Sequence, residues 1–264
     1  MMLDYHMHTP LCKHAVGAPE EYARRAVERG IEEIGFSDHS PMPATYDPDY
    51  RMGIDEYAEY VEMVSRCRTA VPGLRIKLGI EADYHPGTDA FVREVIGRYA
   101  FDYVIGSVHY LGSWGFDNPD LVHFYERKDV YELYREYYGL IVELARTRMY
   151  DIVGHPDVIK KFGHRPEKDY EPLERRALEA IAEAGMALDV NTSGLRRPAK
   201  EIYPSLRMLK AARAMGIGIT FGSDAHDPKH VGESFADAVA HAKAAGFTQF
   251  RRYAQRSFDL VPLP

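Results

Sequence analysis

The sequence contains few of the features that mark secreted or membrane proteins. Only two cysteines occur, Cys12 and Cys67, which is too few for a disulfide framework and favours a reducing compartment. No apolar run is long enough to cross a bilayer, and the N-terminus lacks the basic start and apolar stretch of a signal peptide. We therefore expect a cytoplasmic protein that has no membrane partner.

Amide side chains and net positive charge are also scarce. Two asparagines and two glutamines are present, a depletion that fits either a heat-adapted source or a GC-rich genome. The formal net charge is −7, whereas a general nucleic-acid binder usually carries a basic patch. The sequence thus predicts no nucleic-acid partner, although it is compatible with a locally positive site.

The 264 residues, of which 45% are hydrophobic, are enough for one large domain with a substantial core. Short apolar runs alternate with amphipathic helical stretches along the chain. The runs predict strands at residues 3–6, 31–37, 74–81, 103–108, 151–154, 187–191 and 218–222. The stretches between them predict helices at residues 19–29, 55–68, 129–146, 172–184, 204–215 and 231–245. We interpret the weakly patterned tail after Phe247 as a closing element rather than a second domain.

This alternation of strand and helix indicates a parallel sheet, because parallel strands need a crossover connection. Seven such strands fit either an open doubly wound sheet or a barrel. No Gly-x-Gly-x-x-Gly motif follows the first strand, so a dinucleotide-binding fold loses support.

Histidines and acids follow nearly every predicted strand. They are His6, His8 and His14 after the first strand, Asp38 and His39 after the second, Glu81, His109 and His155 at the next three, and Asp224 and His226 after the last. In a parallel barrel these strand ends meet on one face, where the active sites of barrels lie. Residues two apart, such as His6 and His8, project to the same side of an extended segment. The sequence therefore predicts one shared pocket.

The chemistry of these side chains indicates a metal site. Imidazole and carboxylate together suit zinc, iron or manganese better than magnesium or calcium. Seven histidines with Glu81 and Asp224 are too many for one tetrahedral ion, whereas three divalent ions bridged by Glu81 or a hydroxide give a sensible count. The competing interpretation treats each histidine as a hydrogen-bonded structural residue. That interpretation fits any single one, but seven unpaired buried imidazoles would cost about 1–3 kcal/mol each.

Two neighbouring side chains each have two interpretations. Cys12 lies between His8 and His14 and suits a soft metal ligand, although a buried reduced thiol is the more common state. Asp38 precedes His39 and would orient a ligand from outside the coordination shell of the metal, or else be a solvated loop aspartate.

Six short motifs carry a resemblance to a known family. They are Tyr-His-Met-His-Thr at 5–9, Ser-Asp-His-Ser at 37–40, Gly-Ile-Glu at 79–81, Gly-Ser-Val-His at 106–109, Gly-His-Pro-Asp at 154–157 and Gly-Ser-Asp-Ala-His at 222–226. With these motifs the chain resembles the polymerase and histidinol phosphatase (PHP) family over nearly its whole length. The resemblance implies an α/β fold, namely a distorted (β/α)7 TIM-like barrel formed as a single domain by residues 1–264, with a trinuclear metal site.

The resemblance also assigns ligands to the three ions. It implies that the first ion is held by His6, His8, Glu81 and Asp224. It further implies that Glu81 bridges to a second ion held by His109 and His155, and that the third ion is held by His14, His39 and His226. Three of these residues are also implied to be catalytic, namely Glu81, Asp224 and His226.

Within the family, the chain is similar to the monofunctional histidinol-phosphate phosphatases of histidine synthesis. This similarity rests on Asp-Tyr-His-Pro-Gly at 83–87, Ser-Val-His-Tyr-Leu at 107–111 and Asn-Thr-Ser-Gly-Leu-Arg-Arg at 191–197. It implies hydrolysis of a small phosphate monoester, L-histidinol phosphate, to L-histidinol and phosphate. A metal-activated hydroxide would be the nucleophile.

Other functions stay open from the residues alone. Another phosphoesterase of the family would act on nucleotides, oligonucleotides or phosphotyrosine, and a non-catalytic module would bind metal without turnover. A metal-dependent amide hydrolase also has His-x-His on its first strand, but it usually places a carboxylated lysine at a strand end where Glu81 stands here. The oligomeric state is open as well, and a homo-oligomer is among the states allowed.

Substrate contacts are predicted from charged residues that follow strands on the active face. Arg196 and Arg197 are candidates for the phosphate because a guanidinium binds phosphate through two hydrogen bonds, with solvated surface arginines as the alternative. The remaining candidates are Lys160 and Lys161 for the phosphate, Asp117 with the aromatic Trp114 and Phe116 for the ammonium and imidazole, and His230 in the loop after the last ligand pair.

Overall fold

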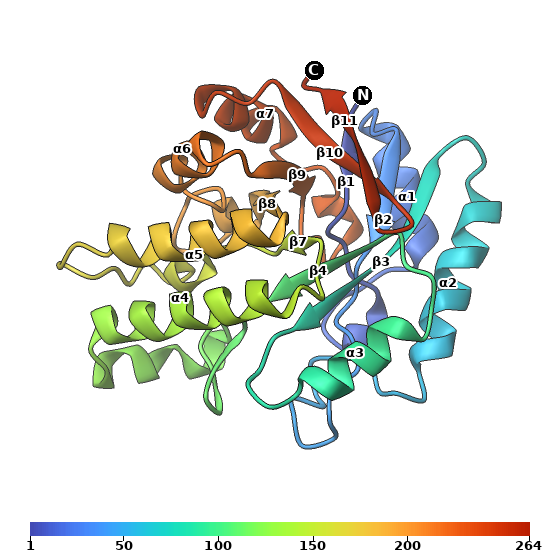
Figure 1. The fold of residues 1–264 in the computed structure, drawn as a ribbon. Helices are drawn as coiled ribbons and strands as arrows, with labels where there is room; N and C mark the ends of the chain where they lie inside the picture. Colours follow the sequence, from blue (N-terminus) through green and yellow to red (C-terminus); the bar gives the residue numbers. More distant parts are fainter.

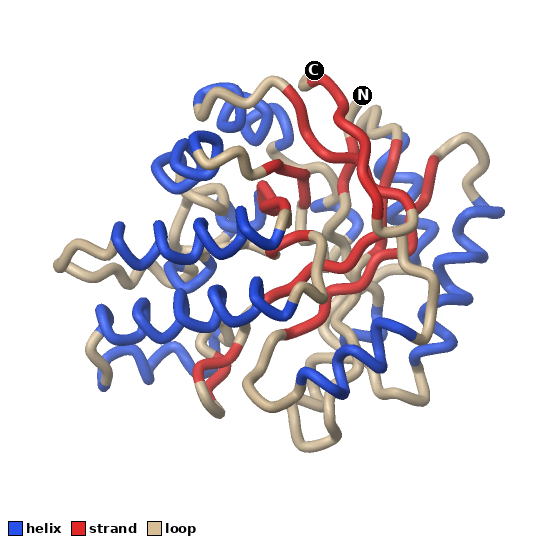
Figure 2. The backbone as a smooth tube through the Cα atoms, in the orientation of Figure 1, coloured by secondary structure: helices blue, strands red, loops and turns tan.

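Seven parallel strands form the centre of the molecule in the computed structural model, which describes residues 1–264. In spatial order they are β1 (Leu3–Asp4), β2 (Glu33–Phe36), β3 (Arg75–Asp83), β4 (Tyr103–Ser107), β7 (Ile152–Val153), β8 (Ala187–Asn191) and β9 (Gly218–Gly222). Each strand is followed by one helix, in the order α1 (Pro19–Glu28), α2 (Tyr57–Ala70), α3 (Asp89–Gly97), α4 (Val130–Thr147), α5 (Glu171–Ala184), α6 (Leu206–Ala214) and α7 (Phe235–Ala244). The strands lie inside and the helices outside (Figures 1 and 2).

The sheet closes into a barrel between its first and last strands. The backbone N–H of Tyr5 donates to the carbonyl of Phe221 over 2.9 Å, and the N–H of His8 donates to the carbonyl of Ala225 over 3.0 Å. These bonds lie at the carboxyl ends of β1 and β9, so both strand ends point to the same rim. The predicted (β/α)7 barrel is therefore confirmed, and the open doubly wound sheet is excluded.

The element bounds agree with the sequence-based prediction except at short elements. Strands β8 and β9 have the predicted bounds, and the six predicted helices are present with ends shifted by a few residues. Helix α3 was not predicted, although Val92, Val95 and Ile96 carry a helical apolar pattern, because its nine residues give a weak signal. The hairpin of β5 (Tyr110–Leu111) and β6 (Trp114–Gly115) was also missed.

One tyrosine fills the barrel interior below the site. The Tyr103 ring stacks on Tyr5 with ring centroids 4.6 Å apart, and its hydroxyl donates to the carbonyl of Tyr5 over 2.6 Å. A Cβ atom at Gly35 or Gly79 would overlap the Tyr103 ring, so these positions in β2 and β3 require glycine. The ring therefore holds the chain immediately before His6 in place.

The C-terminal tail forms a hairpin over the amino ends of the barrel strands. It consists of β10 (Gln249–Ala254) and β11 (Ser257–Pro262), and Figure 1 shows it beside the N-terminus. The N–H of Tyr253 donates to the hydroxyl of Tyr5 over 3.1 Å, and the buried Phe250 packs edge-on against Phe221. The hairpin thus packs against the end of the barrel opposite the site.

Two further expectations concern membrane-spanning helices and disulfides. No helix of the structure combines the length and the apolar character needed to cross a membrane. Cys12 and Cys67 are both buried and free, so neither contributes a disulfide to the fold.

The hairpin makes a stability prediction. Phe250→Ala removes a fully buried ring and should lower the free energy of unfolding by about 3–5 kcal/mol, measured by urea denaturation. The matched control Leu260→Ala removes a side chain that is 55% exposed on the same hairpin and should change stability by no more than about 0.5 kcal/mol. Equal effects of the two substitutions would show that the hairpin does not share the barrel core.

Candidate metal centre

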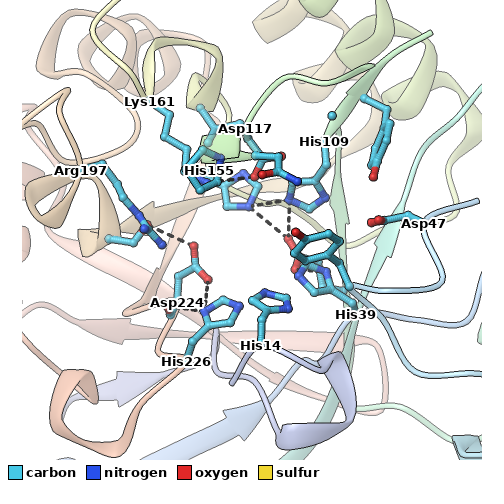
Figure 3. A pocket seen from close by; sticks show the side chains of 18 of the residues that line it. His14, His39, Asp47, His109, Asp117, His155, Lys161, Arg197, Asp224 and His226 are labelled. Atoms are coloured by element: carbon cyan, nitrogen blue, oxygen red, sulfur yellow. Dashed lines mark hydrogen bonds and ion pairs between the residues drawn. The ribbon is translucent and has the colours of Figure 1, made fainter. Parts of the chain in front are cut away.

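One pocket opens at the carboxyl ends of the barrel strands, and it gathers all nine residues predicted as metal ligands. Seven of them line a cavity of about 350 Å³, namely His14, His39, Glu81, His109, His155, Asp224 and His226. His6 and His8 are fully buried and lie against Glu81 beneath the pocket. Figure 3 shows His14 and His226 on one side, with His109 and His155 across the pocket from them. The cavity volume is in the range of small-molecule sites.

The first group of side chains lies at the carboxyl ends of β1, β3 and β9. His6 Nε2 lies 3.3 Å from Glu81 Oε2 and 3.9 Å from Asp224 Oδ1. His8 Nε2 lies 3.6 Å from the same Glu81 oxygen and 3.3 Å from the same Asp224 oxygen. Four atoms that can coordinate a metal ion thus face one small volume.

Two further groups complete the set of nine predicted ligands, which we call the ring. His155 Nε2 lies 3.1 Å from Glu81 Oε1 and 3.3 Å from His109 Nε2, so Glu81 faces this pair with its other oxygen. His14, His39 and His226 form a third group whose ligand atoms all lie within 4.8 Å of one another. Glu81 is therefore positioned between the groups, with one carboxylate oxygen on each side.

Three carboxylates outside the ring hold histidines from behind. Asp189 accepts from His6 Nδ1 over 2.7 Å, Asp83 from His109 Nδ1 over 3.0 Å, and Asp38 from His8 Nδ1 over 3.3 Å. A proton fixed on Nδ1 leaves the lone pair on Nε2, which faces the ring. Asp38 is fully buried, so the interpretation as a solvated loop aspartate is wrong.

Several buried atoms of the ring have no hydrogen-bond partner in the protein. They are His6 Nε2, His8 Nε2, His39 Nδ1, Glu81 Oε2 and His226 Nε2. Leaving such atoms unpaired costs about 1–3 kcal/mol each, unless something else satisfies them. Divalent cations that prefer imidazole and carboxylate would satisfy all five, so the side chains present fit a metal cluster.

Charge varies around the ring. Burial alone would lower the pKa of His6, but the Glu81 and Asp224 carboxylates outweigh it and raise the pKa well above its ordinary value. Burial also opposes the effect of Asp83 and Glu81 on His109, yet these carboxylates raise its pKa to about 9. Burial and the neighbouring His8 instead hold the pKa of His226 well below normal. The pKa values of the clustered histidines thus shift in opposite directions, according to whether carboxylates or other histidines lie beside them.

Two members of the ring have a left-handed backbone. His155 has φ of 31° and Asp224 has φ of 51°, a region that non-glycine residues rarely occupy. Such strain persists only where the surroundings enforce it. At Asp224 the Arg196 guanidinium does so, because its Nη2 donates to the carbonyls of Ser223 (2.7 Å) and Asp224 (3.3 Å).

The predicted substrate-binding residues separate into two sets. Arg197 and Asp117 line the pocket, and Asp117 pairs there with Lys161 over 3.1 Å. Arg196 supports the Asp224 backbone and pairs with Glu233, so it does not line the pocket. The expectation of a pocket position is therefore corrected for Arg196.

Lys160 and His230 also lie outside the pocket. The Lys160 ammonium is buried between Asp157 (2.6 Å) and Glu201 (2.9 Å), where it joins two loops. His230 Nδ1 lies 2.6 Å from Glu233 and does not reach the cavity. The rings of Trp114 and Phe116 are buried behind the pocket wall and pack against Tyr125 and Tyr137, respectively. None of these four side chains lines the pocket.

The structure adds residues that the sequence analysis missed. Asp83 and Asp189 orient histidines, and Arg51, Tyr110 and Ser193 line the pocket. Asp83 had a usable signal, since it lies two residues after Glu81 on the same side of β3. Tyr110 and Ser193 stand in the motifs at 107–111 and 191–197, whereas only the fold brings Arg51 and Asp189 to the site.

Comparison with known proteins identifies the family. Residues 4–193 match the family model described as PHP domain. This match spans well over half of the 264 residues, so the chain belongs to the PHP domain family.

Similar proteins include curated enzymes of nearly equal length. A probable histidinol-phosphatase of Deinococcus radiodurans is 47% identical over 247 residues, covering 93% of this chain and 94% of the relative. The histidinol-phosphatase of Bacillus subtilis is 31% identical over 261 residues, covering 88% and 96%. The crystal structure of the histidinol phosphate phosphatase of Lactococcus lactis, complexed with zinc, L-histidinol and phosphate, has a TM-score of 0.83 at 24% identity over 98% of both chains. This structural likeness shows the same fold.

The charge pattern of the ring makes a pH prediction. The raised pKa values of His6, His8 and His109 favour the protonated imidazole, and any such protons must leave before an ion binds. Zinc binding to chelator-treated protein should therefore release protons, and the apparent affinity should rise as the pH increases from 7 towards 9. Calorimetric titration in buffers of different ionisation enthalpy measures the release. Binding without proton release at pH 7 would rule this arrangement out.

Proposed function

We propose that the protein is a metal-dependent phosphomonoesterase that hydrolyses L-histidinol phosphate to L-histidinol and phosphate, a step of histidine synthesis in the cytoplasm. The observation that carries the proposal is the group of buried histidine nitrogens and carboxylate oxygen that have no hydrogen-bond partner in the protein and lie at the base of a small-molecule pocket. The names of relatives that share its length, at 47% and 31% identity, support the substrate.

The proposed cofactor is a set of three divalent ions, drawn from zinc, iron and manganese. The first is held by His6, His8, Glu81 and Asp224, the second by Glu81, His109 and His155, and the third by His14, His39 and His226. The spacing of the three side-chain groups supports this division. When bound, such ions lower the pKa of water, hold phosphate oxygens and neutralise charge on the leaving alkoxide.

Within this proposal the chain's own residues have distinct tasks. Glu81 has an oxygen on each side of the ring and is suited to bridge two ions. Asp224 accepts from the Ser193 hydroxyl through Oδ2 (3.1 Å), which leaves Oδ1 directed at His8. Because Glu81, Asp224 and His226 border the cavity, we propose them as the catalytic residues that face the reacting phosphate.

Charged residues of the pocket wall suit the two ends of the substrate. Arg51 and Lys161 are already paired with carboxylates, whereas Arg197 has no ion-pair partner. Arg197 is therefore the cation most available to a phosphate dianion, and its planar fork matches phosphate geometry. Asp117 pairs with Lys161 through Oδ2, and we propose that its other oxygen, Oδ1, takes the substrate ammonium.

The first experiment tests the substrate. Purified protein with its native metals should release phosphate from L-histidinol phosphate in strong preference to an aryl phosphate, a 5′-nucleotide and a short oligonucleotide. His8→Ala removes a donor of the first ion and should lower kcat at least about 100-fold, the scale expected when preorganised charge at a reacting centre is lost. Metal content measured on the same samples links the loss to the ions.

Each other outcome of this panel has a defined meaning. Turnover of nucleotides or oligonucleotides alone would keep the metal centre and replace the substrate. Fully loaded metals without turnover of any ester would indicate a non-catalytic module instead.

A second prediction concerns Asp117. Asp117→Asn should lower kcat/KM for L-histidinol phosphate about 10- to 100-fold, because a hydrogen bond to a charged group contributes about 1.5–3 kcal/mol. The same variant should leave turnover of the analogue without the amino group nearly unchanged. Asp120→Asn is the control, since Asp120 is exposed three residues away and does not line the pocket. Equal losses on both substrates would remove Asp117 from ammonium recognition.

A further inference from the structure

Arg51 is a buried arginine on the pocket wall that the proposed reaction does not yet use. It lies in the loop between β2 and α2, its side chain is only 3% exposed, and it borders the same cavity as the ring. One Nη2 lies 2.9 Å from Asp83 Oδ2 and 3.3 Å from Asp47 Oδ2, while Nη1 donates to the carbonyl of Ser40 over 3.1 Å. The guanidinium thus joins this loop to strand β3 and to the residue that follows His39.

The Asp83 carboxylate connects Arg51 to a histidine of the candidate metal centre. Its Oδ2 receives Arg51 and the Tyr46 hydroxyl (3.0 Å), which leaves Oδ1 to accept from His109 Nδ1 over 3.0 Å. His109 then directs Nε2 at His155 Nε2, 3.3 Å away. A continuous chain of charge-assisted hydrogen bonds therefore runs from the loop through Arg51 and Asp83 to a ring histidine.

The geometry of the guanidinium explains why arginine stands here. Asp83 is fully buried, so a carboxylate that lost its cation would remain in a site without water to solvate it. A planar fork reaches Asp83, Asp47 and the Ser40 carbonyl at once, whereas a lysine ammonium is a point charge on a flexible stem. Replacing Arg51 would free the Asp83 carboxylate to turn, and His109 would lose its fixed orientation.

We propose that Arg51 is a positioning residue of the metal centre. It acts through the Asp83 carboxylate to hold His109 in the orientation that binds the second ion. This inference rests on the proposed function, since the second ion serves the proposed phosphate hydrolysis. Groups that orient metal ligands in this way typically change metal affinity or activity about 10- to 100-fold when they are substituted.

A double-mutant cycle on Arg51 and Asp83 tests the proposal. Arg51→Met should lower bound metal by up to one ion per chain and lower kcat about 10- to 100-fold, with KM little changed. In the Asp83→Asn background the fully buried carboxylate that Arg51 neutralises is gone, and the amide oxygen still accepts from His109. Arg51→Met should therefore cost little there, so the double variant should retain more metal than Arg51→Met alone. Metal is counted by mass spectrometry on dialysed protein.

Two controls separate the competing explanations. Lys13 tethers the same loop by donating to the carbonyl of Pro48 (3.1 Å) but does not touch Asp83, so Lys13→Met should keep the full metal content. Arg51→Lys should give a partial defect, because it keeps the charge without the fork. The proposal is overturned if Lys13→Met matches Arg51→Met, or if Arg51→Met costs as much metal in the Asp83→Asn background as in the wild type.

The same cycle stays informative if the substrate assignment fails. Metal content is measured without substrate, so the coupling between Arg51 and Asp83 is read even if wild-type protein does not hydrolyse L-histidinol phosphate. A raised KM with normal metal content in Arg51→Met would instead make Arg51 a substrate contact and end its role through Asp83.

Discussion

Three carboxylate–imidazole hydrogen bonds set the chemistry of the pocket. Asp189, Asp38 and Asp83 each accept from the Nδ1 of one histidine, and this fixes which ring nitrogen keeps a lone pair. Without these hydrogen bonds, the buried imidazoles could rotate, and their Nε2 atoms would no longer point into the pocket. The carboxylates are themselves anchored, Asp38 by the backbone N–H of Thr9 over 3.0 Å and Asp83 by Arg51. The site is therefore organised from its outside inward.

The barrel supplies the fixed frame for these bonds, because residues far apart in sequence meet only where its strands end. Gly35 and Gly79 let the Tyr103 ring fill the interior, and that ring bonds to the backbone just before His6. Where β1 meets β9, Arg196 holds Asp224 on the β9 side by donating to its carbonyl. Packing below the site and polar contacts beside it thus act on the same two strands. Divalent ions held there would outweigh the charge of Glu81 and Asp224 and would make the pocket positive within an acidic protein.

Much of this was predictable from the sequence, since apolar runs that end in histidine or an acid are local signals. Strands β8 and β9 and the nine clustered side chains follow from such signals. The sequence did not tell which of two adjacent residues faces the pocket. Lys161 lines the pocket, whereas Lys160 is buried in an ion pair. Arg197 lines the pocket, whereas Arg196 supports the backbone at the end of β9. Each pair lies at a 3-10 turn, Val158–Lys160 or Thr192–Arg196, where no simple period tells which side chain faces inward. Composition and spacing predict where a strand ends, but the backbone geometry of the following turn determines which side chain faces the pocket.

The pairing of the first and last barrel strands has a consequence for the order in which the site can form during synthesis. His6 and His8 are made long before Phe221 and Ala225, the backbone partners that fix their segment. Tyr5 beside them likewise forms its hydrogen bond to Tyr253 only after the β10–β11 hairpin has been made. The growing chain therefore displays His6 and His8 well before Asp224 and His226 can join them in one pocket.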